Sequence, residues 1–343
     1  MRGRKKRWRG APRVLNVRRS IDTIDNYTLS PKAIVDPLRL NPESKVCVIR
    51  SVGGIGDVLM VTPGLRNLKE QFPLIELTFA IDRHSTNGDI YFELVKNAPF
   101  IDCIIDARYV DRKKYNVVVD VSAVCIPYER KSLPPVNRID LFGYKLGTTK
   151  LNNPLPFYEV TLEEKDWASN FLKNFKKPGC LIGIHTASNE DKRTWSISQQ
   201  LKLLRYLSAR FPYLRFLVFD WNNLHNDWSE VPNVLEASYT NVRQMASLIQ
   251  QCDIFICPDS GPMHIAGALS VPSVVTFGSI PPEARINHYP THESIVLEGL
   301  NCLGCWYDAC PYNIRCMNDL DGIDVGIKVM EKLLHEKTKE KYT

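Results

Sequence analysis

The sequence lacks any long apolar segment. No run of about eighteen apolar residues, the length that a membrane-spanning helix needs, occurs in its 343 residues. The N-terminus is basic, but no apolar stretch follows it, so the pattern of a secretory signal is missing as well. We therefore expect a cytoplasmic protein without a transmembrane segment. Peripheral contact with the inner face of a membrane stays open.

Acidic residues are missing from residues 1–19, which carry nine Lys or Arg. The whole chain has 44 basic and 38 acidic residues, so the remainder has 35 against 38 and is nearly neutral. A basic arm of this kind can hold the phosphates of nucleic acid or an anionic membrane surface. The alternative is a disordered leader that keeps the protein soluble.

Cysteines are few in most of the chain. Six of the ten are scattered, several of them in apolar runs, as expected for reduced, buried thiols in a cytosolic protein. The other four form a C-x2-C-x4-C-x5-C cluster: Cys302, Cys305, Cys310 and Cys316. Four thiolates this close can bind a structural Zn or Fe ion. The alternative is a loop of packed free thiols, but exposed thiols without a metal are prone to oxidation.

The remaining composition is that of a globular protein, with 44% apolar and 24% charged residues. Strands and helices are expected to alternate twice, separated by a Pro-, Asn- and Gly-rich connection near 125–160. The expected strands are 45–50, 75–81, 103–105, 117–121, 180–185, 215–219, 253–257 and 273–277. The expected helices follow 51–57 and occupy 198–211, 241–251, 263–269 and 324–336.

A chain of 343 residues is longer than a domain with a single hydrophobic core usually is. The repeated alternation therefore predicts an α/β protein with two Rossmann-like domains facing across a cleft. The predicted division is a basic arm and lead-in (1–44), an N-terminal Rossmann-like domain (45–165) and a C-terminal Rossmann-like domain (178–335). The last of these includes the cysteine cluster at 302–316.

A glycine-rich loop follows the first strand and leads directly into a helix. Gly53, Gly54 and Gly56 allow a sharp turn and close approach of a ligand to the backbone. The spacing is not that of the G-x-G-x-x-G motif, which argues against a nicotinamide cofactor. Asp57 at the start of the helix is either a helix cap or a catalytic carboxylate.

Two loops of the second half point to an anion. In Pro258-Asp-Ser-Gly-Pro-Met-His264, Ser260 and Gly261 stand at a helix N-terminus suited to a diphosphate, and His264 lies in the first turn. Lys192 and Arg193 follow an earlier strand, where cations can neutralise a leaving diphosphate. The structural alternatives are an N-cap at Asp259 or Ser260 and a solvated basic loop.

Together these segments resemble glycosyltransferase family 9, the lipopolysaccharide heptosyltransferases. The resemblance covers most of residues 45–335. Its specific blocks are VCVIRSVGGIGDVLMVTPGLRNLKEQFP (46–73), IGIHTASNEDKRTW (182–195), CDIFICPDSGPMHIAGALSVPSVVTFG (252–278) and CLGCWYDACPYNIRCM (302–317).

The resemblance implies a GT-B fold and inverting sugar transfer from a nucleotide sugar, ADP-heptose in the best-known members. It implies that Asp57 is the general base, that Lys192 contacts phosphate and that Asp259 contacts the donor sugar. Residues 260, 261 and 264 would hold the phosphates. No catalytic metal is expected, since the helix dipole and cations can stabilise the leaving group.

The sequence departs from the family pattern around the nucleotide pocket. Thr186-Ala187 replaces Pro-Gly, and Thr194 separates Arg193 from Trp195. Residues 219–223 (FDWNN) replace a Gly-rich turn. The identity of the sugar and of the nucleobase therefore stays open.

The acceptor is open among a glycan such as the lipopolysaccharide core, a protein side chain and a modified DNA base. Two alternative functions are a non-catalytic nucleic-acid- or surface-binding protein on the same scaffold and a nucleotide-sugar epimerase. The epimerase requires a second acid/base group, which the sequence does not reveal.

Overall fold

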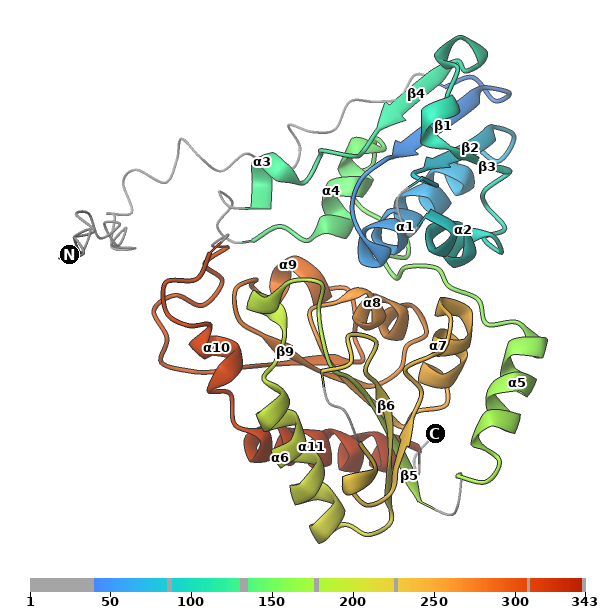
Figure 1. Cartoon of the computed structure of the whole chain (residues 1–343). Helices are drawn as coiled ribbons and strands as arrows, with labels where there is room; N and C mark the ends of the chain where they lie inside the picture. The colour runs from blue at the N-terminus through green and yellow to red at the C-terminus, as the bar shows by residue number, and fades with distance from the viewer. Residues whose placement is uncertain are drawn as a thin grey trace, which may run out of the picture.

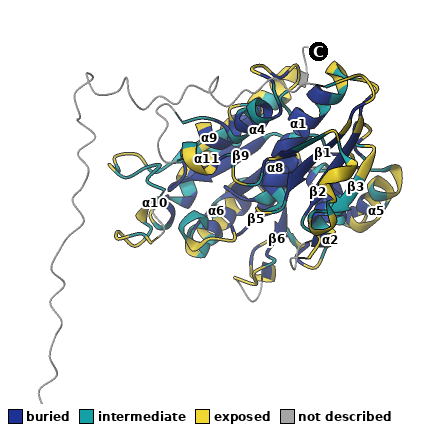
Figure 2. Ribbon diagram, turned by 90° about the horizontal axis from the view of Figure 1, so that it is seen from above, coloured by how far each residue is buried: buried dark blue, intermediate teal, exposed yellow. Residues whose placement is uncertain are grey.

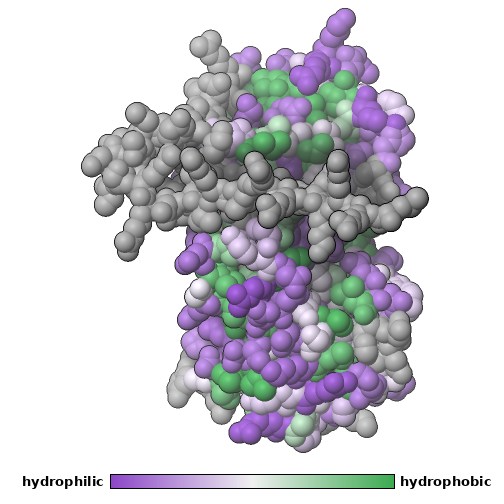
Figure 3. Space-filling model, turned by 60° about the vertical axis from the view of Figure 1, so that its left-hand side comes forward, coloured by the Kyte–Doolittle hydropathy of each residue, from purple (hydrophilic) through white to green (hydrophobic). Residues whose placement is uncertain are grey.

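The computed structural model describes residues 40–84, 88–129, 135–175, 179–224, 228–306 and 309–340. The predicted basic arm, except for residues 40–44, lies outside the described residues. Within them, no helix is long and apolar enough to cross a membrane. On the face drawn in Figure 3, small hydrophobic areas are interspersed with hydrophilic residues.

The first half of the chain forms a parallel sheet with the order β3-β2-β1-β4. Its core is built from the β1 residues Val46 and Val48, which are fully buried against α1. A small cluster around Cys47 and Ala80 also includes residues of the β3–β4 connection. The elements are β1 (Lys45–Arg50), α1 (Ile55–Gln71), β2 (Glu76–Ile81), α2 (Gly88–Val95), β3 (Cys103–Asp106), β4 (Val117–Asp120), α3 (Ile126–Glu129) and α4 (Arg138–Lys145).

The second half forms a parallel sheet with the order β10-β9-β8-β5-β6-β7, and α5 (Leu162–Leu172) lies between the two sheets in the chain (Figure 1). Its central strands are buried along their whole length, as expected where helices cover both faces (Figure 2). The strands are β5 (Cys180–His185), β6 (Leu214–Phe219), β7 (Val234–Glu236), β8 (Ile254–Pro258), β9 (Ser273–Phe277) and β10 (His292–Val296). The helices are α6 (Ile197–Arg210), α7 (Val242–Ile249), α8 (Gly261–Ala268), α9 (Glu283–Ile286), α10 (Arg315–Asn318) and α11 (Gly322–Glu340).

The predicted α/β architecture with two parallel sheets is confirmed, and each expected strand is present to within a few residues. The sequence analysis missed α2, α3, α4, α5, α9, α10, β7 and β10. Of these, α4 matters most for the site, because it lies in the segment interpreted as an irregular connection. It has only eight residues, and Asn137 caps it by accepting the backbone N–H of Ile139 at 2.9 Å.

The strand order places the ligand-binding edge of both sheets. In each sheet the order in which strands are added reverses beside the first strand. The reversal lies between β1 and β4 in one sheet and between β5 and β8 in the other. Open α/β sheets bind ligands at such points, outside the carboxyl ends of the strands. The loops after β1, β5 and β8 therefore start where a ligand is expected. The loops after β1 and β8 lead into the helices α1 and α8, and these two helices pack against each other (Figure 1).

Arg243 of α7 joins the two halves on the other side of this contact. Its guanidinium donates to Glu164 of α5 at 2.6 and 2.8 Å and to the backbone oxygens of Glu93 and Glu159 at 3.0 and 2.7 Å. The side chains of Arg243 and Glu164 are only 7% and 18% exposed. This buried ion pair holds α2, α5 and α7 together.

Replacement of Arg243 by methionine should lower the free energy of unfolding by about 3 kcal/mol, because Glu164 and two carbonyl oxygens lose their donor away from water. Chemical denaturation followed by tryptophan fluorescence measures this. The matched control is Arg205→Met, whose exposed pair with Glu230 should contribute about 1 kcal/mol or less. Equal losses in the two variants would contradict the role of Arg243.

Candidate active site

A cleft of about 740 Å³ opens between the two halves at the carboxyl ends of the strands. Its size is typical of a small-molecule site. All ten predicted site residues outside the cysteine cluster line it: Gly53, Gly54, Gly56, Asp57, Lys192, Arg193, Asp259, Ser260, Gly261 and His264. The structure thus brings together three loops that are up to two hundred residues apart in the sequence. Their individual roles stay predictions.

Asp57 lies in the first turn of α1 and is almost fully buried. Its Oδ2 accepts the backbone N–H of Gly54 at 2.9 Å, so the residue also has the helix-capping role considered above. Its Oδ1 lies 2.5 Å from Arg138 and 3.1 Å from Arg50. Burial alone would raise the pKa of Asp57, but the charges of Arg138 and Arg50 outweigh it and lower the pKa to about 2. Asp57 is therefore ionised at neutral pH.

Three site residues escaped the sequence analysis: Glu129, Arg138 and Arg285, all of which line the cleft. Arg138 bridges two carboxylates, since it pairs with Glu129 as well as with Asp57. Arg285 lies 3.5 Å from Glu129 and 3.7 Å from Asp259, and so connects the two halves. Glu129 is a cleft carboxylate, in addition to Asp57, Glu190 and Asp259, that the sequence analysis did not identify. The only sequence signal for Arg138 was its place after a helix-capping asparagine.

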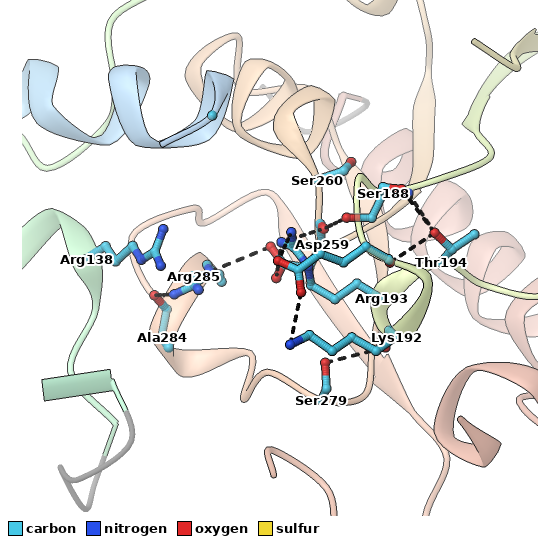
Figure 4. A network of polar contacts seen from close by, with 12 residues as sticks. Arg138, Ser188, Lys192, Arg193, Thr194, Asp259, Ser260, Ser279, Ala284 and Arg285 are labelled. Carbon is cyan, nitrogen blue, oxygen red and sulfur yellow. Dashed lines mark hydrogen bonds and ion pairs between the residues drawn. The ribbon is translucent and has the colours of Figure 1, made fainter. Parts of the chain in front are cut away.

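Asp259 follows β8 and is fully surrounded by cations (Figure 4). Its Oδ2 pairs with Arg193 at 3.2 Å, and its Oδ1 faces Arg285. Burial would raise the pKa of Asp259, but the charges of Arg285 and Arg193 lower it below its usual range. Asp259 therefore stays ionised and holds Arg193 and Arg285 near the N-terminus of α8.

The N-terminus of α8 is open toward the cleft. Ser260 is the N-cap residue, but its side chain makes no capping hydrogen bond; its Oγ lies 3.2 Å from Nδ1 of His185 instead. Ser260 thus occupies the N-cap position of the structural alternative, but its side chain does not cap the helix. A helix end without a side-chain cap leaves N–H groups for an anion, which the macrodipole also favours.

His264 is buried where α8 meets α1. Its Nδ1 lies 2.7 Å from the Tyr289 hydroxyl, and burial lowers the pKa of His264 to about 3, so the ring is neutral. A Cβ on Gly56 would come within 2.2 Å of this ring. Likewise, a Cβ on Gly261 would lie 2.8 Å from Ile55. Both glycines are thus required by the close approach of the two loops.

Lys192 and Arg193 form a short 3-10 turn after β5 and face the cleft. Both pair with Glu190, Lys192 at 3.1 Å and Arg193 at 3.0 Å. Thr194, the residue inserted relative to the family pattern, accepts the backbone N–H of Ser188 at 3.0 Å and so closes this loop. The basic loop is therefore ordered by its own contacts.

The FDWNN turn after β6 is also built into the site. Asp220 is buried and accepts from Thr186 at 2.8 Å and from the indole of Trp228 at 3.0 Å. Thr186 is itself one of the departures from the family pattern, so the two departures compensate each other. The next residues, Trp221 and Asn222, line the cleft where the family tends to have glycine.

The four clustered cysteines lie near one another and do not line the cleft, although Trp306 of the same loop does. The Sγ of Cys310 accepts the backbone N–H groups of Tyr312 and Ile314, both at 3.4 Å. Burial, followed by the proximity of the other three thiols, raises the pKa of Cys316 to about 11. Among the residues that the structure describes, which exclude 307–308 inside the cluster, no three His, Cys, Asp or Glu side chains are arranged as a metal site. The predicted metal is thus not confirmed.

The chain is similar to known proteins in sequence and in fold. Lipooligosaccharide heptosyltransferase 2 of Campylobacter jejuni is 32% identical over 161 residues, 43% of this chain and 49% of that protein. The chain thus matches about half, or less, of the length of its curated relatives.

Two solved structures show the same fold. A family 9 glycosyl transferase from Veillonella parvula superposes with a TM-score of 0.69 at 18% identity, over 88% of this chain and all of that one. TibC of enterotoxigenic Escherichia coli, an iron-containing dodecameric glycosyltransferase, gives 0.64 at 16% identity, over 88% and 81%. TibC has also been solved with ADP-D-β-D-heptose.

A family model assigns the chain more directly. The model for glycosyltransferase family 9 (heptosyltransferase) matches residues 121–313, more than half of the sequence. This range includes the basic loop, the α8 loop and three of the four clustered cysteines. The resemblance seen in the sequence is confirmed: the chain belongs to glycosyltransferase family 9.

Proposed function

We propose that this protein transfers a sugar, heptose by family resemblance, from a nucleoside diphosphate to an acceptor hydroxyl with inversion at the sugar carbon. The observation that carries the proposal is the opposition, across one cleft, of an ionised carboxylate on α1 and an anion-binding helix end on α8. A single displacement needs these two parts: a base for the acceptor and stabilisation for the leaving group.

The donor would lie on the C-terminal side of the cleft. Its diphosphate fits the open N-terminus of α8, with Lys192 and Arg193 as the neighbouring cations. Their present partners are carboxylates of the protein, Glu190 and Asp259, which hold the cations in place. ADP is the favoured nucleotide because TibC binds ADP-D-β-D-heptose.

The acceptor hydroxyl would approach from the side of Asp57. Its oxygen forms the new bond to the sugar carbon as the bond from that carbon to the terminal phosphate oxygen breaks. Asp57 accepts the hydroxyl proton, and the nucleoside diphosphate leaves with the bonding electrons. A pKa of about 2 keeps Asp57 unprotonated but makes it a weak base, so Arg138 has to loosen its contact for Asp57 to accept the proton.

The favoured acceptor is a glycan, because the curated relatives are named lipooligosaccharide and lipopolysaccharide heptosyltransferases. No contact among the described residues favours a protein or nucleic-acid acceptor or a non-catalytic binding role. The arm on which those alternatives depended lies outside the described residues.

Asp57→Asn should reduce transfer by about a hundredfold or more, because a positioned general base contributes that much. Binding of ADP should change by less than about threefold, since the donor lies on the other side of the cleft. Product formation from ADP-heptose and a heptose-deficient lipooligosaccharide, together with calorimetric titration of ADP, measures both. The matched control is Asp89→Asn, an exposed carboxylate of α2. Normal transfer by the Asp57 variant would disprove the base assignment.

The pH dependence of stability gives an independent check of the Asp57 environment. Because folding lowers the pKa of Asp57 from 3.8 to about 2, its ion pairs stabilise the fold by about 2 kcal/mol above pH 4, and this is lost as the pH falls through 2. The difference in unfolding free energy between wild type and Asp57→Asn should therefore be constant from pH 5 to 8 and shrink between pH 4 and 2. A difference that is unchanged at pH 2.5 would contradict the ion-paired state.

We also propose that the four clustered cysteines hold a structural metal ion. Two backbone N–H groups directed at the sulfur of Cys310 suit a thiolate, and TibC, a structural relative, contains iron. A bound Zn or Fe ion would supply the charge that keeps all four sulfurs ionised, despite the burial that raises the pKa of Cys316. The cluster would stabilise the loop between β10 and α10 and take no part in sugar transfer.

Protein purified without chelators should carry about one Zn or Fe per chain, since a site with four thiolates binds one ion. Elemental analysis measures the content. Cys310→Ser should reduce it severalfold, whereas Cys103→Ser, at an exposed cysteine far along the chain, should leave it unchanged. Wild-type protein with well under one metal equivalent would show that the cysteines are free thiols.

A further inference from the structure

Arg285 is a buried cation of the cleft whose partners are few and distant. Its side chain is only 4% exposed, so water does not solvate it. A guanidinium has five N–H donors, yet the hydrogen bond found for Arg285 goes to the backbone oxygen of the adjacent Ala284 at 3.2 Å. Its carboxylate neighbours, Glu129 and Asp259, lie at 3.5 and 3.7 Å, at or beyond the limit of a hydrogen bond. A buried charge with so few close partners is costly.

The neighbours of Arg285 increase this cost. Burial and then the like charge of Arg138 lower the pKa of Arg285. In Figure 4 the guanidinium groups of Arg138 and Arg285 lie next to each other, with Asp259 beyond Arg285. The ring of Trp306 covers Arg285 at 5.1 Å and shields one face. Glu129 pairs with both cations, and a further anion beside Arg285 would offset their mutual repulsion.

Arg193 has more hydrogen-bond partners than Arg285, although its Nε has none. It donates to Asp259 and its backbone oxygen, both at 3.2 Å, and to Glu190 at 3.0 Å. A diphosphate near Arg193 would therefore have to compete with contacts that already exist. At Arg285 it would instead supply short hydrogen bonds that the protein does not provide. The stabilisation gained on binding is thus larger at Arg285.

We propose that Arg285 binds the terminal phosphate of the donor, the one attached to the transferred sugar. The position of Arg285 supports this choice between the two phosphates. Through Glu129 and Arg138 it is linked to Asp57, on the acceptor side, whereas Lys192 and Arg193 lie on the loop after β5. The sugar carbon must lie near Asp57, and the phosphate bonded to it is the terminal one.

This assignment rests on the proposed function and gives Arg285 a direct part in the reaction. Negative charge develops on the terminal phosphate oxygen as its bond to the sugar breaks. A guanidinium already fixed beside that oxygen stabilises the charge without reorganisation. Arg285 thereby joins the α8 N-terminus as the stabiliser of the leaving group.

Calorimetric titration with ADP, AMP and adenosine separates the two phosphate positions without any acceptor. Arg285→Gln should weaken ADP binding by about tenfold to a hundredfold and AMP binding by less than about threefold, with adenosine unchanged. Arg205→Gln, at an exposed ion pair, is the matched control and should bind all three like wild type. Arg285→Lys retains the charge without the forked geometry and should be intermediate; it replaces the glutamine variant if that variant does not fold.

An equal loss of ADP and AMP affinity, or no loss of either, would overturn the assignment, because a purely structural role of Arg285 does not distinguish the two ligands. Failure of the proposed function looks different. In that case wild-type protein would bind none of ADP, UDP, GDP and CDP, and the assignment would fall with it. If wild-type protein binds ADP, and Arg285→Gln keeps the wild-type preference for ADP over AMP, only the role of Arg285 is rejected and the proposed function stands.

Discussion

The architecture of the cleft depends on one chain of ion pairs in which cations and anions alternate from one half of the protein to the other. Each member is held by groups that come from distant parts of the sequence. In spatial order the members are Arg50, Asp57, Arg138, Glu129, Arg285, Asp259, Arg193, Glu190 and Lys192. Charges this buried persist only when they are paired, so the two halves need each other to complete the site.

This chain of ion pairs contains five cations and four anions, so its net positive charge favours the binding of an additional anion. In the absence of ligand, the carboxylates keep the cations from repelling one another and hold them at the cleft wall. A diphosphate that takes over some of these pairings would change the balance along the whole chain. Arg285 is shared by Glu129 and Asp259, so an anion at Arg285 would leave Glu129 freer to hold Arg138. Arg138 is the residue that limits the basicity of Asp57.

Much of this fold was predictable from the sequence because strong local signals mark it. Buried strands such as Lys45–Arg50 and Cys180–His185 contain runs without polar side chains (46–49 and 180–184), and each precedes a loop rich in small or charged residues. The rest depended on tertiary contacts. Glu129, Arg138 and Arg285 lie on short helices of four to eight residues, which have little periodicity to detect. Their pairing across more than a hundred residues leaves no trace in one sequence.

The two glycine-containing loops determine both the contact between the two halves and the geometry of the cleft. Gly56 of α1 accommodates the ring of His264, and Gly261 of α8 accommodates the side chain of Ile55. Each helix start therefore makes room for the other, and any side chain at either glycine would push the loops apart. The same approach places the carboxylate of Asp57 opposite the N–H groups of α8. The absence of side chains at these two glycines thus sets the spacing between the proposed base and the proposed leaving-group site.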